Sequence, residues 1–487
     1  MSDVSNKALK SKVFSGIIWS FGERFLAQIV SFVVSVVLAR YLLPEEYGIV
    51  SMVLVFINLA NVFVSNGFGE SLIQKKDADE LDFSTVFCCS LGVSIALYVL
   101  LYVAAPLIAQ YYRMPVLTVV LRVLAIKIPI SSISTIQHAY VSRHMMFRKF
   151  FYSTLFGTLF SGLLGIFMAI RGFGIWALVA QYLSNTVIDT IVLFFTVSWR
   201  PHFKYSKEKA RLLIGFGWKL TAASLLNRVY VELRSLIIGR KYSASDLAFY
   251  NRGDHLPSLI ITNLNTAIST VLFPAMSNYS DDKVKLKEVS RRSMSLTAYI
   301  VFPLLCGLMV VSSNLVELLL TEKWLPCVPY LWMSCIFFMC QPIQTTNWQI
   351  IKAVGRGDLC LKLEMFKKVI GISMILLSMN FGVMALAISN ALFGIISMFV
   401  NMIPNGRLIG YTLKEQLADF MPSLLLSAIM AALVWCIGRI EMNILLLLLI
   451  QVVAGGIIYV AGSLITRNKN FTYFISIIRQ AKEKSEK

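Results

Sequence analysis

The chain has 487 residues, of which 57% are hydrophobic and only 15% charged, and its mean hydropathy is +0.72. Soluble domains carry about 25% charged residues, so this composition excludes a soluble globular protein. The net charge of +19 would suit nucleic-acid binding. However, Lys and Arg are scattered over many short loops without one basic face, which is typical of the cytoplasmic loops of membrane proteins, and no nucleic-acid partner is expected.

The predicted elements are apolar helices long enough to cross a bilayer. A hydrocarbon core about 30 Å thick needs about 20 helical residues. We predict an all-α membrane protein with 14 transmembrane helices at residues 13–39, 48–72, 83–108, 115–138, 150–170, 174–197, 212–238, 246–276, 293–319, 326–350, 359–379, 382–403, 417–438 and 442–465. The first span follows three lysines, as a signal peptide would, but it is too long and contains Glu23 and Arg24.

The distribution of Lys and Arg over the connections predicts the orientation in the membrane. The two termini and every second loop together hold 28 of the 45 basic residues, the other connections hold seven, and ten lie within spans. Positive charges concentrate on the cytoplasmic side. We therefore expect both termini in the cytoplasm and an even number of spans. Residues 467–487 read as a basic cytoplasmic tail, either amphipathic on the membrane surface or frayed in solvent.

A weak internal repeat appears at an offset of 200 residues. Residues 39–48 (ARYLLPEEYG) resemble residues 239–248 (GRKYSASDLA), and each segment follows one long helix and precedes another. We therefore predict two six-helix lobes around a central cavity, at residues 1–205 and 206–410, plus two C-terminal helices at residues 411–466. Such duplications are common in transporters, whose substrate path lies between the repeats.

Polar residues form stripes along several of the predicted spans. On the first span they are spaced three or four residues apart, so that they lie within about 40° of one line along the helix. The stripes comprise Ser20, Arg24, Gln28, Ser31 and Ser35 on the first span, Asn58, Asn61 and Ser65 on the second, Thr221, Ser224, Arg228, Glu232 and Ser235 on the seventh, and Asp254, Ser258, Thr262, Asn265 and Ser269 on the eighth. Under the offset of 200, the first and seventh stripes coincide in register.

These stripes predict a wet, cation-lined path. An Arg at the bilayer centre costs roughly 2.5–3.5 kcal/mol on insertion scales, so it faces a cavity or a partner. The candidate substrate-binding residues are Arg24, Gln28, Ser31, Arg122, Arg228 and Asn265. The alternative is that Arg228 and Glu232, four residues apart, simply pair, while Ser and Thr hold helices together. Arg122 suits a cavity and the membrane interface equally, and Arg234 lies off the stripe.

Cations exceed acidic residues within the lobes, which favours an anionic substrate. Arginine binds phosphate in a bidentate manner, so a phosphorylated substrate fits better than a cationic drug. Buried carboxylates could carry a coupling proton or sodium ion or could serve as salt-bridge partners, and the candidates are Asp189, Glu232 and Asp254.

The chain lacks the sequence motifs of several function classes. The chain has no P-loop, no Ser/His/Asp or Cys/His arrangement, and no long outward loop of the kind that glycosyltransferases and polysaccharide polymerases use. Its eight cysteines and four histidines show no metal-ligand spacing. We therefore expect neither an enzyme nor a bound cofactor or metal. A channel is harder to exclude, although duplicated lobes with charged interiors favour alternating access.

Four segments resemble the polysaccharide transport family, the Wzx-type flippases of the MOP superfamily. They are residues 15–19 (SGIIW), 38–48 (LARYLLPEEYG), 67–74 (GFGESLIQ) and 250–252 (YNR), and the likeness is greatest to exporters of colanic-acid-like or teichuronic-type units. The resemblance implies fourteen helices, two lobes around a cavity, and flipping of undecaprenyl-pyrophosphate-linked oligosaccharide across the bacterial inner membrane. It also implies cationic side chains on the first helix, where Arg24 lies, whereas Arg228 is extrapolated from its stripe.

The sequence leaves other functions open besides the flippase. A lipid II-type flippase shares the substrate chemistry, whereas a MATE-like multidrug antiporter should have an acidic cavity. A non-transporting scaffold would need no charged interior. Partners implied by the resemblance are the lipid-linked oligosaccharide and membrane lipids, and a complex with a polymerase or glycosyltransferases stays open.

Overall fold

The computed structural model describes residues 26–65, 72, 79–144, 146–468 and 470–472. Within these residues every regular element is a helix and no strand occurs, which confirms the predicted all-α class. After a first helix at Leu26–Tyr41, the helices are α2 Pro44–Ser65, α4 Glu80–Tyr112, α5 Val116–Ala125, α6 Lys127–Arg143, α7 Phe147–Ile170, α8 Ile175–Thr196, α9 Lys207–Lys241, α10 Ala244–Ser277, α11 Lys283–Leu320, a 3₁₀ turn η1 Glu322–Cys327, α12 Val328–Ala353, α13 Gly357–Ser378, α14 Val383–Leu408, α15 Leu413–Ile437 and α16 Ile444–Ile465.

Eleven stretches among the described residues are long and apolar enough to cross a membrane. The protein is therefore a multi-pass membrane protein. The remaining predicted spans are helical as well but fall outside these eleven. The first helix is described only from Leu26, and α9 and α13 carry several charged side chains. The number fourteen stays a prediction.

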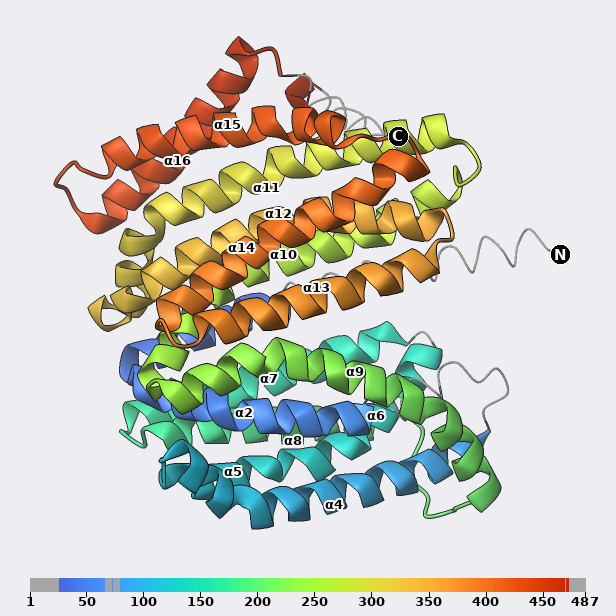
Figure 1. Ribbon diagram of the computed structural model, residues 1–487. Coiled ribbons are helices and arrows are strands. Elements are labelled where there is room, and N and C mark those ends of the chain that lie inside the picture. Colours follow the sequence, from blue (N-terminus) through green and yellow to red (C-terminus); the bar gives the residue numbers. More distant parts are fainter. Residues whose placement is uncertain (1–25, 66–71, 73–78, 145, 469, 473–487) are drawn as a thin grey trace. The chain divides into compact units, whose positions relative to one another are not determined.

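The first of two compact units spans Met1–Ala248 (Figure 1). Its most extensive helix pair is α7 with α8, while α4 packs against both α5 and α6, and α9 packs along α2. By these contacts α9 belongs to the first unit, although the predicted boundary at residue 206 placed it in the second lobe. How the transport lobes divide the chain stays a prediction.

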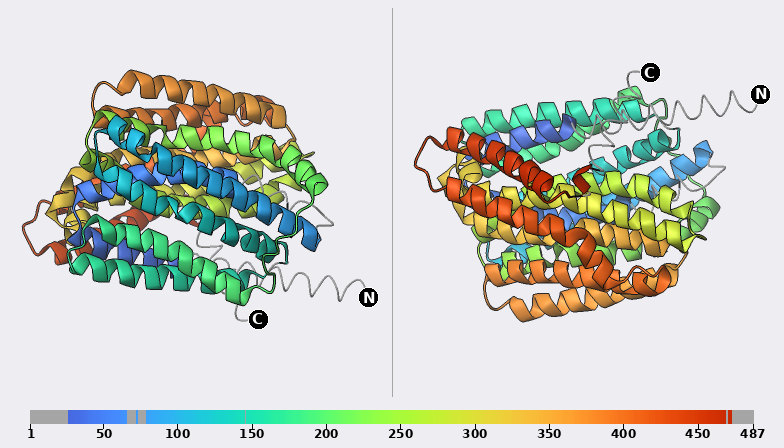
Figure 2. Two further views of the ribbon diagram at one scale, coloured as in Figure 1. Left: turned by 90° about the horizontal axis from the view of Figure 1, so that it is seen from below. Right: turned by 90° about the horizontal axis from the view of Figure 1, so that it is seen from above.

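The second unit spans Phe249–Lys487, and Figure 2 shows its helices from two further directions. In this unit α12 packs against α11 and α14, and α15 and α16 both pack on α11. The Tyr299 hydroxyl of α11 lies 2.8 Å from Ser463 Oγ of α16, and Tyr459 Oη donates to the Tyr299 carbonyl at 2.8 Å. Buried hydrogen bonds of this kind fix α16 to α11, so the two C-terminal helices are an integral part of the unit.

One predicted span is divided into two helices. Residues 115–138 were expected as one helix, but a turn at Ile126 separates α5 from α6. The cause is Pro129, the third residue of α6. Proline has no N–H to offer the carbonyl four residues earlier, at Ala125, and its ring crowds that carbonyl.

The predicted repeat has a structural counterpart in two equivalent turns. The backbone N–H of Leu43 donates to Glu46 Oε2 at 2.7 Å before α2, and that of Ser243 donates to Asp246 Oδ2 at 3.1 Å before α10. Both are the reciprocal half of a capping box, and both involve positions 200 residues apart. Each turn joins a helix ending at residue 41 or 241 to one beginning at Pro44 or Ala244.

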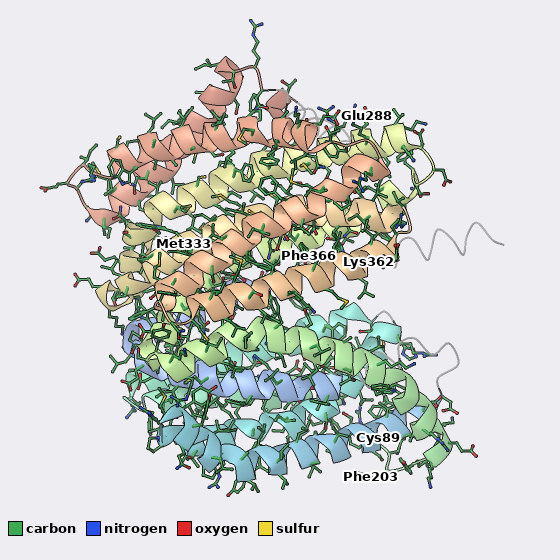
Figure 3. The ribbon with its side chains drawn as sticks, in the orientation of Figure 1. Cys89, Phe203, Glu288, Met333, Lys362 and Phe366 are labelled. Atoms are coloured by element: carbon green, nitrogen blue, oxygen red, sulfur yellow. The ribbon has the colours of Figure 1, made fainter. Side chains whose placement is uncertain are left out.

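The segment after α8 covers the N-terminal end of α4. The Phe203 ring, labelled in Figure 3, lies 5.8 Å from the Phe87 ring, and the Ser206 N–H donates to Thr85 Oγ1 at 3.2 Å. At the helix end itself, Asp79 accepts from the Asp82 N–H at 2.8 Å and binds Lys209 Nζ at 2.5 Å. Asp79 therefore caps α4 and ties it to the start of α9.

Replacing Asp79 by asparagine should lower the melting temperature slightly at neutral pH. Asparagine keeps the cap but removes the charge that holds Lys209. The Lys209 ammonium and the Asp82 N–H lower the pKa of Asp79 to about 2. Because the folded-state pKa is depressed, the stabilisation is complete above about pH 4 and is lost as the pH falls towards 2. The ion pair is half exposed, so we expect at most about 1 kcal/mol.

Thermal unfolding of the wild type and the Asp79→Asn variant in detergent, from pH 7 to pH 3, tests this. The difference between the two melting temperatures should shrink below about pH 4. A difference that stays constant over this range would show that the charge of Asp79 contributes nothing. Asp79→Ala, which also removes the cap, should be less stable than Asp79→Asn by about 1 kcal/mol.

Candidate functional site: a polar cavity between α2 and α9

A cavity of about 360 Å³ lies between α2 and α9 in the first unit. Six of its seven lining residues are polar, and the set is Asn58, Asn61, Val62 and Ser65 from α2 with Ser224, Asn227 and Arg228 from α9. The spacings of three and four residues put each helix's polar residues on one face, and the two helices pack with these faces together. Two of the predicted stripes therefore meet in one place.

The charged pair at this cavity is Arg228 and Glu232. Arg228 Nη2 lies 2.6 Å from Glu232 Oε1, and the side chain of Glu232 is only 11% exposed, against 39% for Arg228. Asn58 Nδ2 donates to the same carboxylate oxygen at 3.2 Å. The pairing considered as an alternative from the sequence does form. It does not remove Arg228 from the cavity lining.

Two polar atoms at the cavity lack hydrogen-bond partners. Arg228 Nε and Asn61 Oδ1 are both buried, and neither has a partner among the described residues. A buried polar group left unpaired costs about 1–3 kcal/mol, and such groups are often completed by a ligand or an ordered water. One donor and one acceptor at the cavity are thus unsatisfied in this conformation.

The first span is only partly described. Arg24 lies outside the described residues, so its predicted role stays a prediction. On the helix Leu26–Tyr41, Gln28 is half-buried and Ser31 is exposed. Neither residue lines the cavity between α2 and α9.

Two further arginines of the first unit lie elsewhere. Arg122 on α5 donates from Nε to the Tyr102 carbonyl at 3.1 Å, and its guanidinium lies 4.2 Å from the Tyr102 ring centroid. Arg122 does not line the cavity between α2 and α9, and its part in substrate binding stays a prediction. Arg234 on α9 is buried, with Nε and Nη2 unpaired within the described chain.

Asp189 belongs to a separate polar cluster between α6, α7 and α8. Its carboxylate accepts a hydrogen bond from Ser153 Oγ, and one of its oxygens lies 3.4 Å from His138 Nε2. Asp189 is 20% exposed in its side chain. It therefore has partners on two neighbouring helices, and its coupling role stays a prediction.

The candidates on α10 make contacts inside the second unit. Asn265 Nδ2 donates to Gln341 Oε1 at 3.0 Å, and Ser334 Oγ donates to Asp254 Oδ1 at 3.1 Å. Both partners lie on α12. Substrate binding by Asn265 and ion coupling by Asp254 stay predictions.

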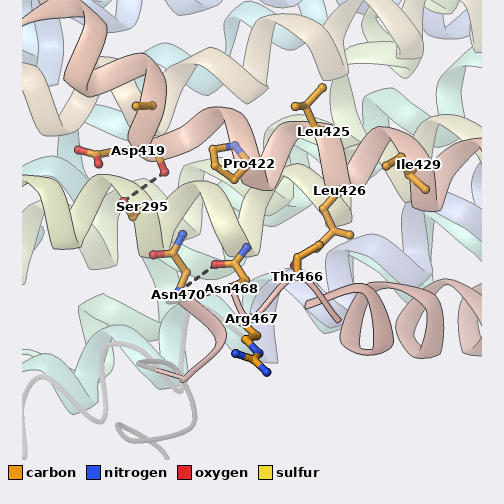
Figure 4. Close-up of a pocket in the computed structure, with 11 residues that line it drawn as sticks. Ser295, Asp419, Pro422, Leu425, Leu426, Ile429, Thr466, Arg467, Asn468 and Asn470 are labelled. Atoms are coloured by element: carbon orange, nitrogen blue, oxygen red, sulfur yellow. Dashed lines mark hydrogen bonds between the residues drawn. The ribbon is translucent and has the colours of Figure 1, made fainter. Parts of the chain in front are cut away.

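A second cavity, of about 460 Å³, lies at the junction of α11, α15 and the end of α16 (Figure 4). Along α15 its wall is mainly apolar, with Pro422, Leu425 and Ile429. At its polar end, Asp419 already binds Arg291 at 2.8 Å and the Tyr411 hydroxyl at 2.6 Å. The cavity between α2 and α9, with its unpaired donor, is therefore the better candidate for a charged ligand.

The sequence stripes did not include every lining residue. Asn227 and Val62 line the cavity but are absent from the predicted set. Asn227 precedes Arg228 and so lies about 100° away around the helix, outside a stripe drawn through Arg228. An amide within a membrane helix was itself a usable signal, whereas nothing distinguished Val62 from other apolar residues.

The part of the chain that contains this cavity matches a known protein family. The profile of the polysaccharide biosynthesis protein family matches residues 37–329, well over half of the chain and including the whole cavity. The chain belongs to this family. It is also 27% identical over 403 residues to the lipopolysaccharide biosynthesis protein WzxC of Escherichia coli K12, covering 81% of this chain and 80% of WzxC.

Two other similarities agree with this assignment. The chain is 26% identical over 359 residues to the teichuronic acid biosynthesis protein TuaB of Bacillus subtilis 168, covering 72% of this chain and 73% of TuaB. Its fold is similar to that of the lipid II flippase MurJ, with a TM-score of 0.75, 16% identity, and coverage of 93% of this chain and 99% of MurJ. The resemblance to the Wzx-type polysaccharide transport family is thereby confirmed, and the likeness to MurJ concerns the fold alone.

Proposed function

We propose that this family member is a flippase for undecaprenyl-pyrophosphate-linked oligosaccharide. It would carry repeat units from the cytoplasmic to the periplasmic leaflet of the bacterial inner membrane, for exopolysaccharide, capsule or O-antigen synthesis. The observation that carries the proposal is the polar cavity holding Arg228 in a multi-pass member of a polysaccharide biosynthesis family. Transport by alternating access needs no chemical step, and we assign no enzymatic activity.

The substrate's diphosphate suits Arg228. The guanidinium offers a planar pair of donors that matches phosphate oxygens. At about 4 Å and an effective dielectric near 20, one such contact is worth roughly 4 kcal/mol before desolvation. The cavity of about 360 Å³ has room for on the order of ten water molecules. A diphosphate, with nine non-hydrogen atoms, fits into that space by displacing them.

The remaining lining residues suit the glycan. A sugar hydroxyl moved into hydrocarbon without a partner costs about 2–7 kcal/mol, so an oligosaccharide cannot cross a bilayer unaided. The amides of Asn58, Asn61 and Asn227 and the hydroxyls of Ser65 and Ser224 can replace hydrogen bonds to water. The prenyl chain stays in the lipid throughout.

Orientation and partners follow from the charge distribution. The bias of 28 to seven basic residues supports a placement with both termini in the cytoplasm. The partners we propose are the lipid-linked oligosaccharide and the surrounding membrane lipids. A further complex with the polymerase or the glycosyltransferases that use the same lipid carrier is consistent with this role.

Reconstituted vesicles test the function directly. A fluorescent undecaprenyl-pyrophosphate-linked oligosaccharide placed in both leaflets should become fully accessible to an external quencher only when the protein is present. The same oligosaccharide on uncharged undecaprenol should remain half protected, because it lacks the diphosphate. Lipid II in one parallel assay and a cationic dye in another separate the rival substrates, and transport of either in place of the oligosaccharide would refute the proposal.

A further inference from the structure

The ion pair between Arg228 and Glu232 is incomplete. Glu232 engages only Nη2 of the guanidinium, at 2.6 Å, while Nε stays buried without an acceptor in the described part of the chain. Other arginines of this protein form complete pairs. Arg291 binds Asp419 through Nε and Nη2 at 2.9 and 2.8 Å, and Arg356 binds Asp358 through the same two atoms at 2.8 and 2.9 Å. The pair in the cavity therefore uses one hydrogen bond where two are possible.

An incoming diphosphate can accept the hydrogen bond from Arg228 Nε that Glu232 does not accept. Once the Glu232 carboxylate moves away and the Arg228 side chain turns its buried Nε towards the cavity, two oxygens of the diphosphate can accept from Nε and Nη2 together, in the bidentate geometry that arginine forms with phosphate. The diphosphate also carries more negative charge than one carboxylate. It can therefore replace Glu232 at Arg228 and gain one hydrogen bond in doing so.

Glu232 would still have a partner after such an exchange. Asn58 Nδ2 donates to Glu232 Oε1 at 3.2 Å, and this bond does not depend on Arg228. A displaced carboxylate is thus not left as a buried charge without a hydrogen bond, which would be costly. Asn58 lies on α2 and Glu232 on α9, so the two helices remain joined at this point.

We propose that Glu232 is an internal counter-ion, which occupies Arg228 in the empty carrier and yields it to the diphosphate of the substrate. This role rests on the proposed flippase function and differs from that of a proton or sodium carrier. With Glu232 in place the empty cavity holds no net charge at this pair. Small anions with a single charge then gain little binding free energy by entering the cavity. The empty protein can also change conformation without moving an unpaired arginine through a region of low dielectric.

The Glu232→Gln variant tests this role, because glutamine has the same size and no charge. We expect the purified variant in lipid nanodiscs to bind undecaprenyl pyrophosphate about tenfold more tightly than the wild type, which corresponds to about 1.4 kcal/mol. In vesicles, net translocation should fall, because the empty carrier returns with an unpaired arginine. Exchange of labelled for unlabelled substrate, which needs no empty return, should be retained.

A matched control is Glu317→Gln, which neutralises an exposed carboxylate on α11 that forms no ion pair among the described residues. This control should bind undecaprenyl pyrophosphate as the wild type does. Glu232→Asp, which withdraws the carboxylate by one methylene, should tighten binding to an intermediate degree and serves if the glutamine variant does not fold. Unchanged or weaker binding in folded Glu232 variants, with normal binding by the wild type, would overturn the counter-ion role and leave the flippase function standing. No binding by the wild type would refute the function itself.

Discussion

Replacing Arg228 by alanine should reduce translocation of the lipid-linked oligosaccharide by about 100-fold or more, with normal insertion into the membrane. The variant loses the cation that would hold the diphosphate. The contact is worth roughly 4 kcal/mol before desolvation, and the free energy that remains after the desolvation cost is subtracted corresponds to a loss of this size. Export of polymer by cells that depend on the variant, together with the vesicle assay, measures the loss. Lysine at this position should restore part of the activity, because it keeps the charge without the bidentate geometry.

The control for this variant is Arg171→Ala, which removes an exposed arginine at the end of α7. Arg171 does not line the cavity, so translocation should stay near the wild-type rate. Loss of Arg228 also leaves Glu232 without its ion pair. The double variant Arg228→Ala with Glu232→Ala separates this effect, because it should regain stability but not transport. Near-normal translocation by Arg228→Ala would remove the arginine from the mechanism.

Alanine in place of Gly48 should destabilise the protein by about 3 kcal/mol, the largest structural effect we expect from adding one methyl group. A Cβ at Gly48 would overlap the backbone carbonyl of Ala244 at the start of α10. Backbone cannot move aside as a flexible side chain can, and overpacking costs about 1–3 kcal/mol even where the neighbours are side chains. The melting temperature in detergent and the yield of monodisperse protein report the effect.

Gly92→Ala provides the comparison for this prediction. Gly92 lies within α4, and a Cβ there would meet nothing within 4 Å. Alanine is favoured over glycine in a helix interior by about 1 kcal/mol, so this variant should be as stable as the wild type or slightly more stable. Equal stability of the two variants would show that α2 and α10 can separate at Gly48 at little cost.

Much of the fold could be predicted because each helix carries its own signal. Apolar length predicted the helices that the described residues form, and polar spacing predicted that Asn58 and Asn61 share one face of α2 and that Ser224 and Arg228 share one face of α9. The division of α5 from α6 was missed because hydropathy averages over Pro129, although proline itself predicts a break. Helix ends were also misplaced where α9 and α11 continue well beyond the expected spans, since polar helical turns outside the bilayer have no apolar signal.

The pairing of side chains could not be predicted to the same degree. Spacing allowed Arg228 and Glu232 to meet, but it could not show that Asn58 of another helix would share the carboxylate. Spacing also could not show that Arg122 of α5 would donate a hydrogen bond to the Tyr102 carbonyl of α4. Contacts between helices far apart in sequence depend on rotation and tilt, which one helix does not determine alone.

The chain passes from one compact unit to the next inside an uninterrupted helix. The division falls after Ala248, whereas α10 runs from Ala244 to Ser277. Near its start, Gly253 lies so close to η1 and α12 that an added Cβ would come within 2.7 Å of the Leu331 nitrogen. A loop would let two bodies swing independently, whereas a helix passes on both tilt and twist. Any working stroke of this protein must therefore bend or rotate α10 itself, and the place for a bend is Pro257, which leaves the Gly253 carbonyl without its helical N–H partner.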